Sequence, residues 1–468
     1  MDIDKRHEQE MREAFNVQMK ALLKNADRFR KTDPVVRVGL ESELALDSPG
    51  IAPGEMEPVR DAIVKCVADD IDVELGAAQV ELRTPPLRLD TPGGFDVLKS
   101  VYRTRVNALE TSAKRHGVSV LRVGANPFLP TLGTPRTNKP KYQMVPNFYN
   151  DHHDPRKNTL IGVGKRRIDI GDAAVVSLFQ SFQVNLEARS LEDACDKMNR
   201  SFMLSPFLLA LSANARFLQC ADSGMQDTRV LSWAMSHDTR PIADTGARDV
   251  RVVSWEKSFD LRPSRGDRDG LRVGLPPRYF KDIRAYLERA GRFPFILHAP
   301  EAALAIAIGM TWLDCRVKFI GDSAIVELRS LSTQPTIDEE LLLTLLFLGR
   351  LEDSQARRER LLPIAMVRKN RVTAMLHGTG RPMWIMNDRG EPQKLPFKDA
   401  LRLELSRTKA GLERLGLASA LNKDLLRDTL AKGNPSDRLA TAIGAQKNDL
   451  ITPDAMRTAL LHTGMLRF

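Results

Sequence analysis

The chain has 468 residues, of which 42% are hydrophobic and 28% charged, as in an ordinary globular protein with room for a large core. It has no apolar run near the roughly 18–20 residues of a membrane span, its polar start lacks a secretory apolar region, and its 4 cysteines are scattered, so we expect a cytoplasmic protein without a membrane segment. The net charge of +10 suits nucleic acid or anionic small molecules, but no zinc finger, RRM signature or basic zipper is present, which makes nucleic acid the less favoured partner.

Hydrophobic periodicity divides the chain into strand-like and helix-like runs. Alternation of apolar and polar residues predicts a strand, and apolar residues three and four positions apart predict a helix. Pro206 is the position at which one long helix would break. In chain order we expect a helix over 5–29, strands over 35–46, 71–75 and 78–83, a helix over 96–116, a strand over 182–188, a helix over 193–218, a loop over 260–277, a strand over 325–330, and helices over 338–362 and 397–415.

Four strand-like regions carry acids or amides on one face only. In the run 35–46, Glu41 and Glu43 lie opposite the valines and leucines. A solvated face would carry lysine and threonine as well as glutamate, so we interpret the four faces as one functional surface rather than four ordinary solvated faces. The polar residues of the other three regions are Asp72, Glu74, Gln79, Glu81 and Arg83, then Gln183, Asn185 and Glu187, then Glu327 and Arg329.

A face of this kind is suited to hard cations. Carboxylate and amide oxygens are the ligands that suit Mg²⁺ or Mn²⁺, and Mg²⁺ in proteins usually bridges a few carboxylates to nucleotide phosphates. Arg329, two residues after Glu327, is placed to stabilise charge on a transferring phosphoryl group. The pattern therefore predicts a metal–nucleotide site on one face of a sheet.

These strands resemble the signature strands of the glutamate–cysteine ligases, in the branch that includes plant and proteobacterial members. Residues 39–43, 74–82, 183–186 and 326–329 carry the likeness in this order, and it extends from about Val35 to Pro335. Two further stretches are similar: residues 139–144, and residues 206–214 with Arg229 and Trp233 after them.

The resemblance implies both a fold and an activity. The fold is α+β, a glutamine-synthetase-like antiparallel sheet bent into an active-site funnel with helices on the outside. The activity is an ATP-dependent joining of the γ-carboxylate of glutamate to the amine of cysteine through an acyl phosphate, as in glutathione biosynthesis. The implied ligands are amino acids, ATP and Mg²⁺, with Mn²⁺ as a substitute, and the oligomeric state is left open.

The resemblance also assigns roles to individual residues. Gln183 stands where some branches have a metal-binding histidine, and Gln183 and Asn185 would also contact the nucleotide. Arg329 would contact phosphate and act in catalysis, and Arg229 would hold an amino-acid carboxylate. The acids implied as metal ligands are Glu41, Glu43, Glu74, Glu81 and Glu327.

Two alternative functions stay open. One keeps the fold and the chemistry but uses a different amine as acceptor. The other is a non-catalytic basic binding protein, against which the intact acids argue, since a like-charge cluster is costly to keep without a function. We expect a catalytic core over residues 1–335 and a mostly helical region over 336–468 packed on it.

Weaker candidates are better explained structurally. The glycines and basic residues of Gly162–Arg167 could cradle phosphate, but they match neither a Walker A nor a Rossmann fingerprint and are more typical of a surface turn. Asp151–Asp154 has ligand-type residues in a pattern typical of a polar loop. His116 and His298 are interpreted as structural.

Overall fold

The fold is built on one large antiparallel sheet. The computed structural model describes residues 4–32, 35–67, 71–155, 159–162, 167–239, 273–292, 294–444 and 451–467. The sheet has 9 strands in the order β13-β14-β8-β1-β3-β2, with β4 and β5 also paired to β1, and β17 paired to β5. These strands are β1 (Arg37–Asp47), β2 (Ile71–Val73), β3 (Gln79–Arg83), β4 (Leu87–Arg88), β5 (Ser119–Leu121), β8 (Ser181–Ala188), β13 (Cys315–Ile320), β14 (Ser323–Ser332) and β17 (Leu466–Arg467).

The strand register places the polar residues of neighbouring strands on one face. On β1 the alternating Val38, Leu40 and Leu44 are completely buried on the apolar face. Residues directly opposite each other in an antiparallel pair share a face, so the register extends the polar face of β1 across the sheet. The opposed pairs on that face are Glu43 with Glu81, Glu41 with Arg83, Glu41 with Gln183, Gly39 with Asn185, Asn185 with Glu327, and Glu327 with Arg316.

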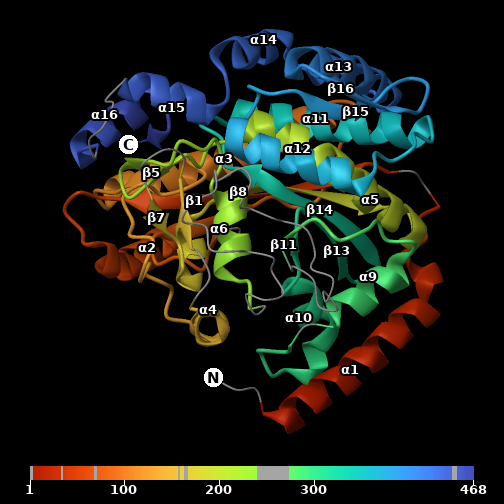
Figure 1. Ribbon diagram of the computed structural model, residues 1–468, viewed down its shortest axis with the longest axis horizontal. Helices are drawn as coiled ribbons and strands as arrows, with labels where there is room; N and C mark the ends of the chain where they lie inside the picture. The colour runs from red at the N-terminus through yellow and green to blue at the C-terminus, as the bar shows by residue number, and fades with distance from the viewer. Residues whose placement is uncertain are drawn as a thin grey trace.

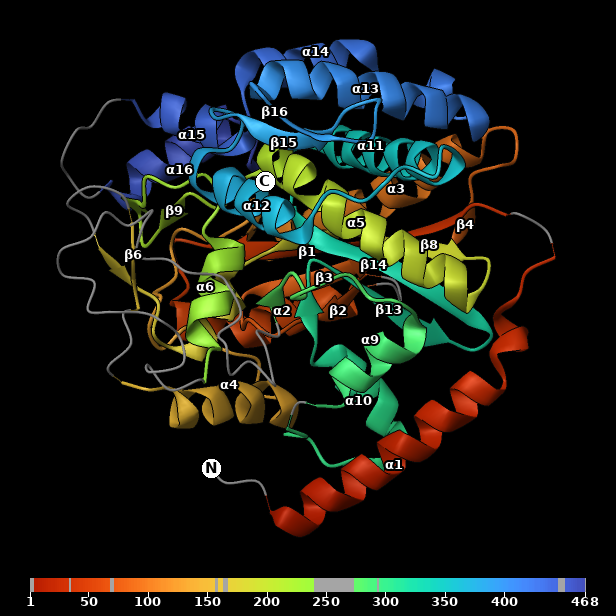
Figure 2. The same cartoon turned by 45° about the vertical axis from the view of Figure 1, so that its right-hand side comes forward.

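Helices cover the apolar face of the sheet. The central helix is α5 (Leu191–Ser212), which contacts β13 and β14. The helices α11 (Ile337–Ala356) and α12 (Ile364–His377) pack on α5, and α13 (Phe397–Arg414) packs on α11. Figure 1 shows these helices stacked above the sheet, and the turned view in Figure 2 keeps the same order. The prediction of a bent antiparallel sheet with helices outside it is confirmed.

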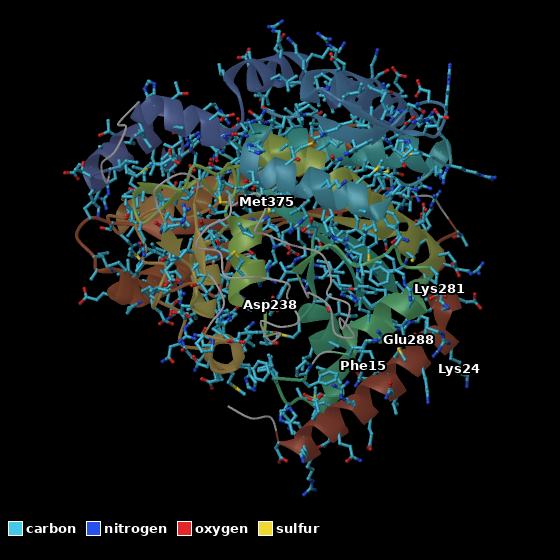
Figure 3. The ribbon with its side chains drawn as sticks, in the orientation of Figure 1. Phe15, Lys24, Asp238, Lys281, Glu288 and Met375 are labelled. Atoms are coloured by element: carbon cyan, nitrogen blue, oxygen red, sulfur yellow. The ribbon has the colours of Figure 1, made fainter. Side chains whose placement is uncertain are left out.

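The opposite side of the sheet faces α4 (Pro140–His152), α6 (Arg229–Ser236) and α10 (Ala303–Gly309). In Figure 1, α4 and α10 lie below the strands. The long first helix α1 (Lys5–Lys24) runs outside α10. Its Phe15, labelled in Figure 3, packs against Phe295 with 6.1 Å between ring centres.

The longest predicted helix does not break at its proline. Helix α5 runs through Pro206, which has no N–H to offer the carbonyl of Phe202 one turn earlier. The hydroxyl of Ser205 donates to that carbonyl instead, at 3.2 Å. A local hydroxyl donor thus offsets the lost backbone hydrogen bond, and the predicted end at residue 218 falls in a short strand, β9 (Phe217–Leu218).

The remaining elements complete the layers and edges. Residues after 335 form mainly helices but also a two-stranded hairpin and β17, and β17 joins the main sheet with Leu466 opposite Leu121. The division of the chain at residue 335 stays a prediction. The other elements are α2 (Met56–Lys65), α3 (Gly94–Arg115), α9 (Ile283–Ala290), α14 (Lys423–Lys432), α15 (Pro435–Ile443), α16 (Pro453–His462), β6 (Leu160–Ile161), β7 (Ile168–Asp169), β10 (Ala221–Asp222), β11 (Val273–Gly274), β12 (Trp312–Leu313), β15 (Met383–Met386) and β16 (Pro392–Leu395).

The minor predictions from the sequence have different outcomes. Residues 163–166 of the basic turn and residues 260–272 of the predicted loop lie outside the described residues. Asp151 and His152 belong to the last turn of α4 rather than to a loop. His116 caps a helix end, with Nδ1 2.9 Å from the carbonyl oxygen of Ser112. No helix in the described ranges is both long and apolar enough to cross a bilayer.

Candidate active site

Acids from separate parts of the sheet face one cavity. It lies on the polar side of the sheet and has a volume of about 370 Å³. Its acidic residues come from the middle of β1, from β3 and from the turn after β2. The pairing of β1 with β3 brings together acids that are about 40 residues apart in the chain. Of the residues predicted from the sequence, those that line this cavity are Glu41, Glu43, Glu74, Glu81, Gln183 and Arg329.

One end of the cavity is strongly acidic. Glu43 and Glu81 stand directly opposite each other on paired strands, an arrangement that is unfavourable for like charges. Burial, with the nearby charge of Glu74, raises the pKa of Glu43 to about 7. Burial also raises the pKa of Glu74, and burial with the charges of Glu41 and Glu74 raises that of Glu81 well above its usual value. Lys141 also lines the cavity and lowers the pKa of Glu74, but burial outweighs it. We call this part of the cavity the acidic end (Glu43, Glu74 and Glu81).

The other end is rich in basic side chains. Glu327 is completely buried and pairs with Lys318 at 2.8 Å, with Arg329 at 2.8 Å and with Arg316. Burial alone would raise the pKa of Glu327, but the charges of Arg316, Arg329 and Lys318 hold it well below its usual value. The ammonium of Lys318 also reaches Glu41, at 2.9 Å. We call this group the basic end (Glu41, Arg316, Lys318, Glu327 and Arg329).

Two amides of β8 lie between the two ends. The Nε2 of Gln183 donates to Glu43 at 3.2 Å and to Ser181 Oγ at 3.0 Å. The side-chain oxygens of Gln183 and Asn185 are both buried and have no hydrogen-bond partner in the described part of the chain. Because a buried acceptor without a partner is costly, these oxygens indicate a missing donor or cation. Gln183 lines the cavity, whereas Asn185 lies behind its wall.

Arg229 lies behind the cavity rather than on its surface. It begins α6, and its side chain is 4% exposed. Its guanidinium donates to the carbonyls of Arg329 at 3.1 Å and Leu331 at 3.2 Å, so it holds the end of β14 on which Arg329 stands. Its Nε is buried without a partner among the described residues. The predicted contact of Arg229 with a substrate carboxylate stays a prediction.

The wall facing the sheet is apolar and aromatic. It comes from α4, α6, α10 and the segment after α10. Trp233 and Trp312 lie with 5.4 Å between ring centres, and the indole N–H of Trp233 is buried without a hydrogen-bond partner in the described ranges. The cavity therefore combines a charged floor with a wall suited to an apolar or planar group. The wall residues include Tyr142, Val145, Trp233, Ile306, Met310 and Trp312.

Sequence reasoning missed the strand that supplies two of the basic groups. Arg316 and Lys318 lie on β13, opposite or beside Glu327 on β14. The signal was present, since Cys315–Ile320 places Arg316 and Lys318 two residues apart and Gly321 turns the chain back toward Glu327. Interpreting this segment as a hairpin, with bases on one strand and an acid on the other, would have predicted this contact.

The donor set at the acidic end fits a divalent cation. Glu43, Glu74, Glu81 and the unpartnered oxygen of Gln183 are all hard oxygen donors, the type that Mg²⁺ binds. Across the described ranges, no three acidic, histidine or cysteine side chains already form a group that could hold a metal ion. Mg²⁺ completes its shell with phosphate oxygens and water when it arrives with a nucleotide, so a partial carboxylate set is compatible with it.

The bent antiparallel sheet with helices on its apolar face defines a class of fold, the glutamine-synthetase-like fold. Residues 37–389 match the sequence model of the family described as glutamate–cysteine ligase family 2, and the chain belongs to that family. The sequence resemblance to glutamate–cysteine ligases is thereby confirmed.

Individual relatives are distant. A curated protein of Rubrobacter xylanophilus, provisionally named glutamate–cysteine ligase 2-1, is 25% identical over 195 residues, which are 41% of this chain and 45% of that protein. A bifunctional glutathione synthetase from Pasteurella multocida superposes with a TM-score of 0.54 at 12% identity, over 96% of this chain and 54% of that one. The chain thus matches about half the length of either protein, and the structural likeness shows the shared fold alone.

Proposed function

We propose that the chain is an ATP-dependent ligase that joins the γ-carboxylate of glutamate to the amine of cysteine through an acyl phosphate. The observation that carries this proposal is the cavity itself, in which partly buried acids without sufficient cations face Arg316 and Arg329. Membership of glutamate–cysteine ligase family 2 supports it. An acidic end can hold a metal–nucleotide complex, and a neighbouring basic end can stabilise a phosphoryl group in transfer.

In this proposal, the acids bind the metal–nucleotide complex and Arg329 stabilises the charge on the transferring phosphoryl group. Mg²⁺, when bound with ATP, would neutralise phosphate charge and orient the γ-phosphate. Glu43, Glu74 and Glu81 would hold it, and Gln183 would add its unpartnered oxygen. Arg329 offsets negative charge while a donor carboxylate oxygen bonds to phosphorus and the bond to ADP breaks.

The second step forms the amide. The acceptor nitrogen bonds to the acyl carbon, the phosphate leaves, and the nitrogen loses a proton. The cavity walls hold the acceptor and exclude water, which would otherwise hydrolyse the acyl phosphate. Arg229, buried beneath the backbone of Arg329, keeps that arginine in place.

The purified protein is expected to release ADP and phosphate from ATP and Mg²⁺ only when a carboxylate substrate is present, most strongly glutamate. The physical reason is that the cavity positions the γ-phosphate for attack by a carboxylate oxygen. Coupled detection of ADP, with mass spectrometry of the amide product, measures this. Release of AMP and pyrophosphate would indicate adenylation and contradict the proposal.

A different acceptor amine is the second candidate, and the aromatic wall favours it. Cysteine is small, whereas Trp233, Trp312 and Tyr142 offer a surface for a larger apolar or planar amine. With glutamate fixed, this second candidate predicts that a panel of amines includes an apolar one with a higher kcat/KM than cysteine. Trp312→Ala should then raise the KM for that amine much more than the KM for ATP. A preference for cysteine over every apolar amine would favour the first candidate.

A further inference from the structure

A single lysine bridges two carboxylates at the basic end. The Nζ of Lys318 lies 2.9 Å from an oxygen of Glu41 and 2.8 Å from an oxygen of Glu327. The two acids come from β1 and β14, which are separated in the sheet by β8, so the ammonium spans three strands. A cation shared between carboxylates of different strands is the arrangement in which a metal ion would otherwise be expected.

The carboxylate of Glu327 has no acceptor position left. An ionised carboxylate has about four acceptor positions. One oxygen of Glu327 accepts from Lys318 and from Arg316 Nη2 at 3.3 Å. The other oxygen accepts from Arg316 Nε and from Arg329 Nη1 at 2.8 Å. A metal ion could bind Glu327 only by displacing one of these donors.

The same group is poorly solvated. The side chains of Lys318, Glu41 and Glu327 are 22%, 15% and 0% exposed. Removing one partner from a buried pair leaves an uncompensated charge, so displacing the ammonium would be costly. A divalent ion placed near Lys318 would also meet a positive charge at short range, where screening by water is weak.

We propose that the ammonium of Lys318 is a permanent cation at the basic end and takes the place of one metal ion, so that a metal brought with ATP binds at the acidic end only. This inference rests on the proposed function for the identity of the nucleotide. Lys318 is a positioning residue, because it acts by pairing with the carboxylates of Glu41 and Glu327 and so keeping them from binding a metal ion.

Counting bound metal tests the inference without turnover. Mn²⁺ is titrated into the protein with a non-hydrolysable ATP analogue, and free Mn²⁺ is measured by electron paramagnetic resonance. Lys318→Met, which keeps the length and removes the charge, should bind one more Mn²⁺ per chain than wild type. Lys318→Arg, which keeps the charge, should bind the same number as wild type. Equal counts in Lys318→Met and wild type would overturn the inference.

A matched lysine controls for the loss of an ion pair. Lys31 is 26% exposed and pairs with the buried Glu187 of β8 at 3.4 Å, but it lies away from the cavity. Lys31→Met should therefore leave the Mn²⁺ count unchanged. An extra ion in this variant as well would show that any lost lysine adds a site, and would overturn the role of Lys318.

A second pair of variants keeps the test decisive if Lys318→Met does not fold. With Lys318 in place, Glu41→Gln should leave the Mn²⁺ count unchanged, whereas Glu81→Gln should lower it by one. Loss of an ion in Glu41→Gln would place a metal at the basic end and overturn the inference. The ADP-release assay tests the proposed function separately, so a failure of catalysis and a wrong metal count can be told apart.

Discussion

Replacement of Arg329 by alanine is expected to lower kcat by about 10² or more, the effect of removing one preorganised electrostatic contact to a reacting group. Arg329 lines the cavity, its guanidinium donates to Glu327 at 2.8 Å, and its backbone carbonyl accepts a hydrogen bond from Arg229. Glu327 keeps Arg316 and Lys318 when Arg329 is lost, so the fold should survive. Steady-state kinetics with saturating ATP measures the effect.

Two variants separate catalysis from structure in that experiment. Arg329→Lys should recover only part of kcat, since a point charge lacks the planar fork of a guanidinium. Arg37→Ala removes an arginine on the same face that pairs with Glu187 at 2.9 Å, outside the cavity, and should leave kcat near that of wild type. Wild-type turnover in Arg329→Ala would remove Arg329 from the site.

The acidic strands were predictable because alternation is a local property. Side chains two apart on a strand share a face whatever the partner strand, so the faces of Glu41, Glu43 and Glu81 followed from the residues alone. The helices over 96–116 and 397–415 followed from spacing in the same way, and the structure has them as Gly94–Arg115 and Phe397–Arg414. Their boundaries differ by at most two residues, as expected where helix ends depend on capping.

Charge compensation could not be predicted from alternation alone, because it depends on which strands meet. That Arg316 and Lys318 fill the acceptor positions of Glu327 follows only when 315–332 is recognised as a hairpin with the register of β13 and β14. The contact between Lys318 and Glu41 joins residues 277 positions apart in the chain. Alternation places all five acids implied as metal ligands on the polar face, but in the fold they differ in charge compensation. Glu327 is surrounded by cations, whereas the acids of the acidic end are not.

The aromatic wall escaped prediction because it also depends on contacts between distant segments. Tyr142, Trp233 and Trp312 come from three segments that are not neighbours in the sequence, and each is an ordinary apolar or aromatic residue in its own segment. The packing of α4, α6 and β12 around the cavity brings them over the charged floor. The chemistry of the floor is thus encoded locally, whereas the shape that would select an acceptor is encoded by tertiary packing.

Replacement of Glu81 by glutamine should separate stability from function. Glu81 faces Glu43 directly and feels Glu41 and Glu74, so the change removes a repelling charge and keeps the shape. The apo protein should be as stable as wild type or slightly more so, although the pair with Arg83 at 2.9 Å is lost. The variant should lose most activity and most of the stabilisation by Mg²⁺–ATP, which for wild type is about 2.7 kcal/mol at a hundredfold excess over Kd.

The pH dependence of apo stability follows from the burial of these acids and, second, from their repulsion. Burial and Glu74 raise the pKa of Glu43 from 4.5 to about 7, so the folded state binds more protons than the unfolded state between these values. This contribution is fully present below pH 4.5 and is lost as the pH rises to about 7, so the free energy of unfolding should fall over this range. Glu81→Gln should make the fall shallower, because the Glu81 carboxyl, whose pKa is also raised, no longer titrates. Chemical denaturation at several pH values measures it.

Two glutamates on other parts of the protein serve as controls for Glu81→Gln. Glu288 is exposed on α9, as Figure 3 shows, and Glu288→Gln should change neither stability nor the Mg²⁺–ATP effect. Glu187 shares the polar face but is compensated by Arg37 and Lys31, so Glu187→Gln should lose stability and keep the Mg²⁺–ATP effect. Full activity and a full Mg²⁺–ATP shift in Glu81→Gln would exclude Glu81 as a metal ligand, and the acidic end would lose its proposed role.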